Sequence, residues 1–159
     1  MTRLARAVKL ELTLQVRQKF LHAAVFSGLI WLAVLLPLSH GLRPITPSQR
    51  LRVAALRHSH DMLWRGYFGH TSPTGSTLTY RVMSSGFVTY GQWWAGETLA
   101  WGCGGYGDPA TVVKEWMHSP EHRAILLSPR YHFVGIGRSY GTFLGQPGAA
   151  VWTVDWGHR

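Results

Sequence analysis

The stretch WMHSPEHRAILLSPRYHFVGIG, from Trp116 to Gly137, holds the end of one helix, a second short helix and the beginning of a strand. Ser119 and Pro120 are residue types typical of a helix N-cap and of the first helical position. We therefore expect a short helix to begin here and to run to Leu127. The segment HFVGIGRSY, residues 132–140, then predicts a strand.

Three more helices are predicted on the N-terminal side of this stretch. The first begins after the N-cap residue Ser48 and ends at Gly66, the second covers 78–85, and the third begins at Pro109. On the C-terminal side, a glycine-rich hairpin leads to a second strand, AAVWTVDW, residues 149–156. Helices followed by paired strands predict an α+β fold rather than a parallel sheet.

A stretch of 23 residues without Asp, Glu, Lys or Arg, 20–42, precedes this soluble part. As a helix, residues 20–38 would span about 28 Å, close to the hydrocarbon core of about 30 Å. Residues 1–19 carry five Lys or Arg against one Glu, which favours a cytoplasmic N-terminus and an exported remainder. We expect residues 20–41 to be a retained transmembrane anchor, and a signal segment cleaved near Gly41 is the alternative.

Charge and cysteine content exclude several classes of protein. The formal net charge is +9, yet residues 43–159 hold eleven Lys or Arg and six Asp or Glu, spread singly. This distribution is unlike a nucleic-acid-binding face. Cys103 is the one cysteine, so an intramolecular disulfide and a thiolate zinc site are both excluded. The sequence assigns no role to Cys103.

Three segments place a titratable side chain among apolar and glycine neighbours. They contain His70, Glu97, and the pair His118 and His122. Two imidazoles and a carboxylate suit zinc or a similar ion, with positions left for water. The same groups also suit an acid, a base and a residue that orients them. Spacing alone leaves purely structural roles open for each of them.

Four motifs in order, FGHTSPTG (68–75), Gly-Glu-x-x-Ala (96–100), the stretch from Trp116 to Gly137, and VWTVDW (151–156), are similar to the bacterial branch of the CAP superfamily. This is the SCP domain shared by cysteine-rich secretory proteins, insect venom antigens and plant pathogenesis-related proteins. The resemblance implies an α-β-α sandwich with a small antiparallel sheet between helical layers. We expect that domain over residues 51–159, after a linker over 42–50.

The resemblance also implies a site. The family's cleft is lined by two histidines and two glutamates, which hold a divalent metal in some members. His70 matches the first histidine, Glu97 a glutamate and His122 the second histidine, whereas Ser119 stands near the place of the other glutamate. His118 is an addition without an assigned role. We therefore expect His70, Glu97 and His122 to be the catalytic or metal-binding residues, with a divalent metal such as zinc as the candidate ion; the sequence identifies no cofactor beyond that.

These features predict a membrane-tethered, envelope-facing CAP domain that binds a small or apolar ligand, since relatives of this kind are secreted and some bind sterols or fatty acids. The alternatives are an accessory subunit docked to a larger membrane complex, and a hydrolase that activates water with His70, Glu97 and His122. Whether the protein is an enzyme stays open. Residues 20–38 would lie in the bacterial inner membrane, with the domain periplasmic or extracellular, or secreted after cleavage; nucleic acid is not an expected partner.

Overall fold

The computed structural model describes residues 39–88 and 90–159. The predicted basic lead, 1–19, and all but the last three residues of the predicted anchor, 20–41, lie outside these ranges. Within them, no helix combines the length and apolar character needed to cross a bilayer.

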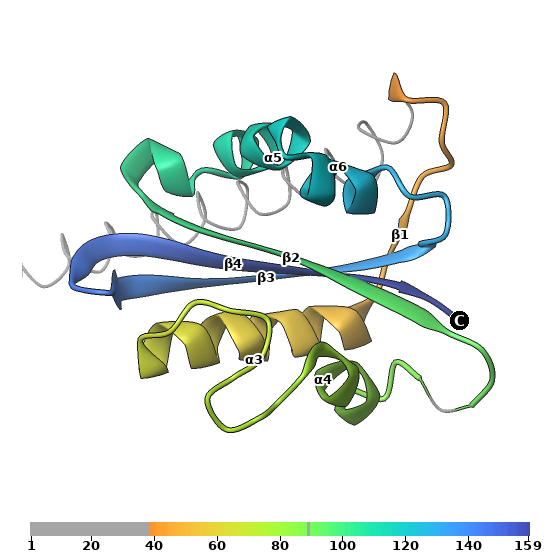
Figure 1. Cartoon of the computed structure of the whole chain (residues 1–159), viewed down its shortest axis with the longest axis horizontal. Helices are drawn as coiled ribbons and strands as arrows, with labels where there is room; N and C mark the ends of the chain where they lie inside the picture. The colour runs from red at the N-terminus through yellow and green to blue at the C-terminus, as the bar shows by residue number, and fades with distance from the viewer. Residues whose placement is uncertain (1–38, 89) are drawn as a thin grey trace, which may run out of the picture.

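A four-stranded sheet lies between two helical layers (Figure 1). Its strands stand in the order β1-β3-β4-β2, with bounds Thr46–Pro47 for β1, Trp94–Cys103 for β2, Phe133–Phe143 for β3 and Gln146–His158 for β4. β4 pairs antiparallel with β3 and with β2, whereas β1 pairs parallel with β3. The predicted antiparallel sheet is therefore mixed, because two residues of the predicted linker join its edge.

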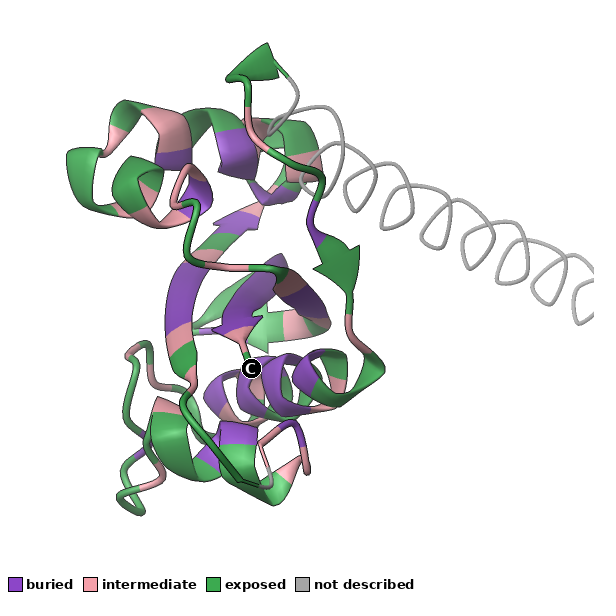
Figure 2. Ribbon diagram, turned by 90° about the vertical axis from the view of Figure 1, so that its right-hand side faces the viewer, coloured by how far each residue is buried: buried purple, intermediate pink, exposed green. Residues whose placement is uncertain are grey.

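One helical layer consists of α3, Gln49–Arg65, and α4, Leu78–Ser84. The other consists of α5, Pro109–His118, and α6, Pro120–Leu126, which follow the short 3-10 helix η2, Gly104–Gly107. The two layers cover opposite faces of the sheet, and the buried residues gather between them (Figures 1 and 2). The predicted α-β-α sandwich is confirmed.

The ends of α3 follow the predicted capping residues. The Ser48 side chain accepts a hydrogen bond from the backbone N–H of Leu51, and Gly66 adopts a left-handed φ of 68° while its N–H bonds to Met62. Serine at the N-cap and glycine after the last turn suit these two geometries. One face of α3 is buried, and it consists of Leu51, Ala54, Ala55, His58, Ser59 and Met62.

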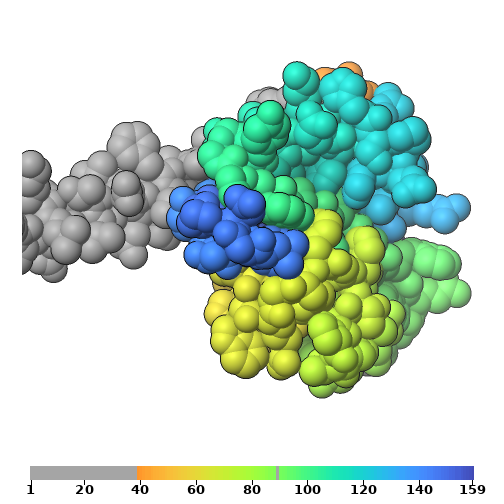
Figure 3. Space-filling model, turned by 60° about the vertical axis from the view of Figure 1, so that its left-hand side comes forward, coloured from red at the N-terminus to blue at the C-terminus, as the bar shows by residue number. Residues whose placement is uncertain are grey.

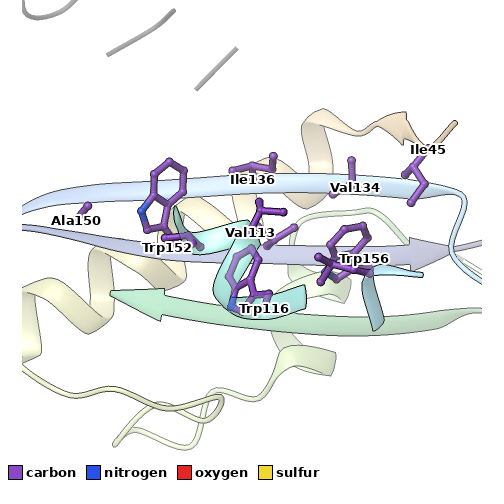
Figure 4. Packing of buried hydrophobic residues seen from close by; sticks show 11 residues of the cluster. Ile45, Val113, Trp116, Val134, Ile136, Ala150, Trp152 and Trp156 are labelled. Carbon is purple, nitrogen blue, oxygen red and sulfur yellow. The ribbon is translucent and has the colours of Figure 1, made fainter. Parts of the chain in front are cut away.

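The core beneath α5 and α6 is built around three tryptophans (Figure 4). Trp116 of α5 and Trp152 and Trp156 of β4 are each no more than 3% exposed. The indole N–H of Trp116 donates to the carbonyl of Leu99 and that of Trp152 to the carbonyl of Gly107, both at 3.0 Å. Buried indoles need such partners, so these bonds also fix α5 and η2 on the sheet.

β2 is the longest element that the sequence does not predict. It occupies the middle of a segment rich in glycine and aromatic residues, and it forms the edge of the sheet next to β4. Glycine is disfavoured within strands because it adds backbone entropy and no packing. A Cβ at Gly96 would clash with Tyr131, and a Cβ at Gly102 would clash with Tyr106. Glycine therefore suits both positions despite its low strand propensity.

On the opposite face, α3 packs directly against the backbone of β3. A Cβ at Gly135 would clash with the backbone of Leu51 and Arg52, and a Cβ at Gly137 with that of Ala55. These two glycines alternate along β3, so they face the same side of the sheet. The close contact of helix and strand therefore depends on the absence of side chains here.

Gly137→Ala should lower the free energy of unfolding by about 3 kcal/mol, because helix backbone cannot yield as a side chain can. Gly141→Ala is the matched control: a Cβ there would meet only the end of the Leu63 side chain, at 3.3 Å, and should cost less than about 1 kcal/mol. Urea denaturation followed by circular dichroism measures both. Equal losses for the two variants would contradict the proposed role of this contact.

Candidate functional site

The site is built around Glu97, whose side chain is 1% exposed and points from β2 toward the layer of α3 and α4. Its Oε1 lies 2.7 Å from Nδ1 of His70, and its Oε2 accepts a hydrogen bond from Nη2 of Arg81, also at 2.7 Å. The structure thus brings together two of the three predicted site residues, His70 and Glu97, and adds an arginine.

Arg81 fixes the loop that carries His70. This arginine is buried in α4, and its guanidinium also donates to the backbone carbonyls of Ser76, at 2.8 Å, and His70, at 3.0 Å. The loop between α3 and α4 has no regular structure of its own. Its shape near His70 therefore depends on the same cation that neutralises Glu97.

His58 approaches Glu97 from α3. Its Nε2 is 3.9 Å from Oε1 of Glu97 and 3.0 Å from the carbonyl oxygen of Gly69. Because a carbonyl only accepts, Nε2 is the donor in that hydrogen bond. Burial lowers the pKa of His58 and outweighs the opposing effect of the Glu97 charge. The imidazole is accordingly neutral at neutral pH.

Glu97 and His70 shift each other's protonation in opposite directions. Burial by itself would raise the pKa of Glu97, but the hydrogen bond from His70 and the charge of Arg81 outweigh it and lower that pKa. The hydrogen bond to Glu97 raises the pKa of His70 despite partial burial. The pair therefore favours a carboxylate facing an imidazolium.

His122, the third predicted residue, comes from α6 in the other helical layer. Its Nδ1 lies 2.8 Å from Oγ of Ser119, and its ring is tilted against that of Trp116. Burial lowers the pKa of His122, and the charge of His70 lowers it further. His122 is thus within electrostatic reach of His70, while Glu97 receives its hydrogen bonds from His70 and Arg81. His118 instead makes a hydrogen bond to the carbonyl of Lys114.

Tyr131 packs against β2 on the face of the sheet opposite to Glu97, among the core residues beneath α5 and α6. Its hydroxyl oxygen is 2.5 Å from the position that a Cβ of Gly96 would take. A side chain at position 96 would therefore displace Tyr131. At Gly69, next to His70, a Cβ would meet only the carbonyl of Thr71, at 3.9 Å.

Asp155 lies directly opposite Glu97 in the pairing of β2 with β4. It is fully buried, and neither of its carboxyl oxygens has a hydrogen-bond partner among the described residues. Burial and the neighbouring Glu97 carboxylate raise the pKa of Asp155 well above its usual range. Two carboxyl groups thus share one buried region, and Asp155 is the one that keeps its proton.

The arrangement does not suit the predicted zinc ion. Among residues 39–88 and 90–159, no group of three His, Cys, Asp or Glu side chains is placed to hold a metal. Arg81 occupies one oxygen of Glu97 and Nδ1 of His70 the other. A divalent cation at Glu97 would have to replace one of these hydrogen bonds, from the imidazole or from the buried guanidinium. The metal at His70, Glu97 and His122 stays a prediction that this geometry does not support.

Sequence reasoning missed His58, Arg81 and Asp155. His58 and Arg81 also line a cavity of about 280 Å³ between α3 and α4. The cavity therefore lies next to Glu97, which both side chains approach. The one local signal for His58 is its place on the apolar face of a predicted helix. Arg81 and Asp155 carry no such signal, since their roles depend on burial and on strand register.

Asp155→Asn should change the pH dependence of stability. The unfolded chain loses the Asp155 proton near the ordinary value of 3.8, whereas the folded chain keeps it to a higher pH, so folded wild type loses stability as pH rises through that interval. The unfolding free energy of the variant relative to wild type should therefore increase from about pH 4 toward neutrality. Urea titrations across this range measure the difference.

Asp61→Asn is the control with the opposite sign. Hydrogen bonds from Tyr67 and Arg65 outweigh burial and lower the pKa of Asp61, so its stabilising contribution is lost as pH falls. The stability of this variant relative to wild type should decrease as pH rises through the acidic range. A pH-independent difference for Asp155→Asn would show that the buried carboxyl is not held protonated.

Comparison with known proteins places this chain in a family. Residues 10–156 match the CAP family, described as the cysteine-rich secretory protein family. The chain is 36% identical to the uncharacterized protein YkwD of Bacillus subtilis over 97 residues, which are 61% of this chain and 35% of YkwD. It is 35% identical to the uncharacterized membrane protein YlbC of the same organism over 105 residues, 65% of this chain and 29% of YlbC.

A different likeness covers 45 residues at 80% identity, 28% of this chain and 19% of a fluoroquinolones export permease protein of Mycobacterium tuberculosis. The chain thus spans between 19% and 35% of the length of these curated relatives.

Two solved structures share the fold. An extracellular protein containing an SCP domain from Bacillus anthracis aligns with a TM-score of 0.66 at 25% identity, over 82% of this chain and 39% of that one. An outer surface protein of Borrelia burgdorferi aligns with a TM-score of 0.69 at 20% identity, over 86% and 93% of the two chains. The family match over most of the chain and the shared α-β-α fold show that this chain is a bacterial member of the CAP family.

Proposed function

We propose that this CAP domain is an envelope-facing binding module that accepts a small ligand through an acidic group. The ligand would lie at the edge strand β2, with the imidazolium of His70 as its main hydrogen-bond donor. The observation that carries the proposal is the 2.7 Å contact between Nδ1 of His70 and the buried carboxylate of Glu97.

This contact makes Glu97 a fixed counter-ion. Both of its oxygens are engaged by cationic donors, and its side chain is 1% exposed. A carboxylate in that state is poorly placed to remove a proton from water, which supports binding over hydrolysis. The His70 side chain, by contrast, is 61% exposed. With Nδ1 directed at Glu97, its Nε2–H is the group that a ligand can reach.

His122 supplies a second imidazole of different character. It is partly buried, its lowered pKa keeps it neutral, and its Nδ1 is engaged with Ser119. One charged and one neutral imidazole from opposite helical layers suit a ligand that offers both acceptor and donor groups, as a protonated phosphate does. Figure 3 shows how α5 and α6 fill the upper part of one face of the molecule and α3 with its following loop the lower part.

The proposal includes a membrane tether through residues 20–38, in the inner membrane, with a cytoplasmic N-terminus and the domain on the outer side. Two relatives support membrane association, since their names describe a membrane protein and an export permease. The likeness to the permease also favours the second candidate, an accessory subunit of a membrane complex. Cross-linking of the full-length chain in membranes tests it, and a specific partner should persist in His70→Ala.

Binding should require His70 and should weaken as pH rises through its raised pKa, because the imidazolium loses its charge. Inorganic phosphate and acetate, titrated against the full-length chain in mild detergent and followed by the NMR signals of the histidine rings, are suitable probes. His70→Ala should lower affinity at least tenfold. His60→Ala, which changes an exposed histidine on α3, should leave affinity unchanged.

Glu97→Gln separates the role of charge from that of contact. It removes the carboxylate that raises the pKa of His70, so anion binding near neutrality should weaken and should recover at about pH 5.5, where a histidine near its ordinary pKa is charged. Binding that is insensitive to His70→Ala, or that strengthens as pH rises, would overturn the proposal.

A further inference from the structure

A second pair of histidines lies at the far end of the β3–β4 hairpin. Phe133 pairs with Gly157 in the sheet, and the backbone N–H of His132 donates to the carbonyl of Gly157 at 2.9 Å. This bond holds His132, the residue before β3, beside the end of β4, where His158 follows Gly157. The Nδ1 atoms of the two histidines are 3.0 Å apart.

The two rings meet nearly at right angles, with their Nδ1 atoms at the contact. Their planes are nearly perpendicular, at 85°, and their centres are 4.6 Å apart. Two imidazole nitrogens that bind one metal at about 2.0–2.1 Å and are 3.0 Å from each other subtend an angle close to a right angle, which places the ring centres about 4.7 Å apart. A head-on N–H···N hydrogen bond of the same length would separate the centres by about 5.3 Å. The observed separation fits the convergent arrangement.

The surroundings leave space for water on such an ion. His132 is exposed and His158 is partly exposed, and Trp94, which pairs with His158 on its other side, is 54% exposed. The neighbouring cation, Arg159, is held elsewhere: its guanidinium donates to the carbonyl of Phe87 and stacks on the Phe133 ring. It therefore does not occupy the space between the two imidazoles.

We propose that His132 and His158 form a two-histidine site for a divalent late transition metal, Cu²⁺ or Ni²⁺, with water in the remaining positions. The near-right angle favours the square-planar or octahedral geometry of these ions. Tetrahedral zinc would instead hold its nitrogens about 3.3 Å apart. A bound ion would cross-link the residue before β3 to the last residue of β4. This site shares no residue with the proposed ligand site at His70, so either can fail without the other.

Calorimetric titration of Cu²⁺ and Ni²⁺ into the full-length chain without an affinity tag, in mild detergent, tests the proposal. One ion should bind per chain, and His132→Ala and His158→Ala should each lower its affinity at least tenfold. His60→Ala is the control for a general loss of imidazole and should retain the affinity of wild type. Equal affinity in wild type and in both pair variants would overturn the proposal.

Two further measurements keep the test independent of variant folding. Electron paramagnetic resonance of the Cu²⁺-loaded wild type should show two equatorial imidazole nitrogens, and a spectrum with one or none would overturn the proposal. Ni²⁺ should also raise the thermal unfolding midpoint of wild type by mass action, and this increase should disappear in His132→Asn. An equal increase in that variant would place the ion elsewhere.

Discussion

The buried carboxylate of Glu97 ties the edge strand β2 to three segments that are distant along the chain. Arg81 reaches it from α4, His70 from the loop before that helix, and His58 from α3. A buried carboxylate without partners would be strongly destabilising, and removing one partner of a buried ion pair costs about 3–5 kcal/mol. The position of α4 and the shape of the loop are therefore coupled to the charge on one strand residue.

That coupling explains how an irregular loop presents an imidazole in a defined orientation. Arg81 donates to two loop carbonyls as well as to Glu97, and Glu97 fixes the ring orientation of His70 by accepting from Nδ1. Each contact alone would leave the loop free to rearrange. Together they place the other ring nitrogen of His70 at the solvent side of β2, because the two nitrogens of an imidazole point in different directions.

Local sequence signals accounted for much of this fold. Ser48 and Gly66 marked the ends of α3, and the motifs around His70 and Glu97 brought together residues that are in contact. β2 was not predicted because its glycines, which admit neighbouring side chains and backbone, interrupt the alternation of apolar and polar residues that is typical of a strand. Asp155 lay in a predicted strand, but its position opposite Glu97 depends on the register of β2 against β4, which no local pattern contains.

The unequal protonation of the two buried carboxyl groups sets the charge of the site. Glu97 has Arg81 and His70 as partners and is ionised, whereas Asp155 has no hydrogen-bond partner among the described residues and keeps its proton. His70 and Arg81 are positively charged and Glu97 is negatively charged, so the cluster of these three residues with the protonated Asp155 has a net charge of +1. His70 is its exposed cation. If Asp155 were ionised, the cluster would be neutral and its attraction for an anion would be lost. The buried, protonated Asp155 thus keeps the edge of β2 electropositive.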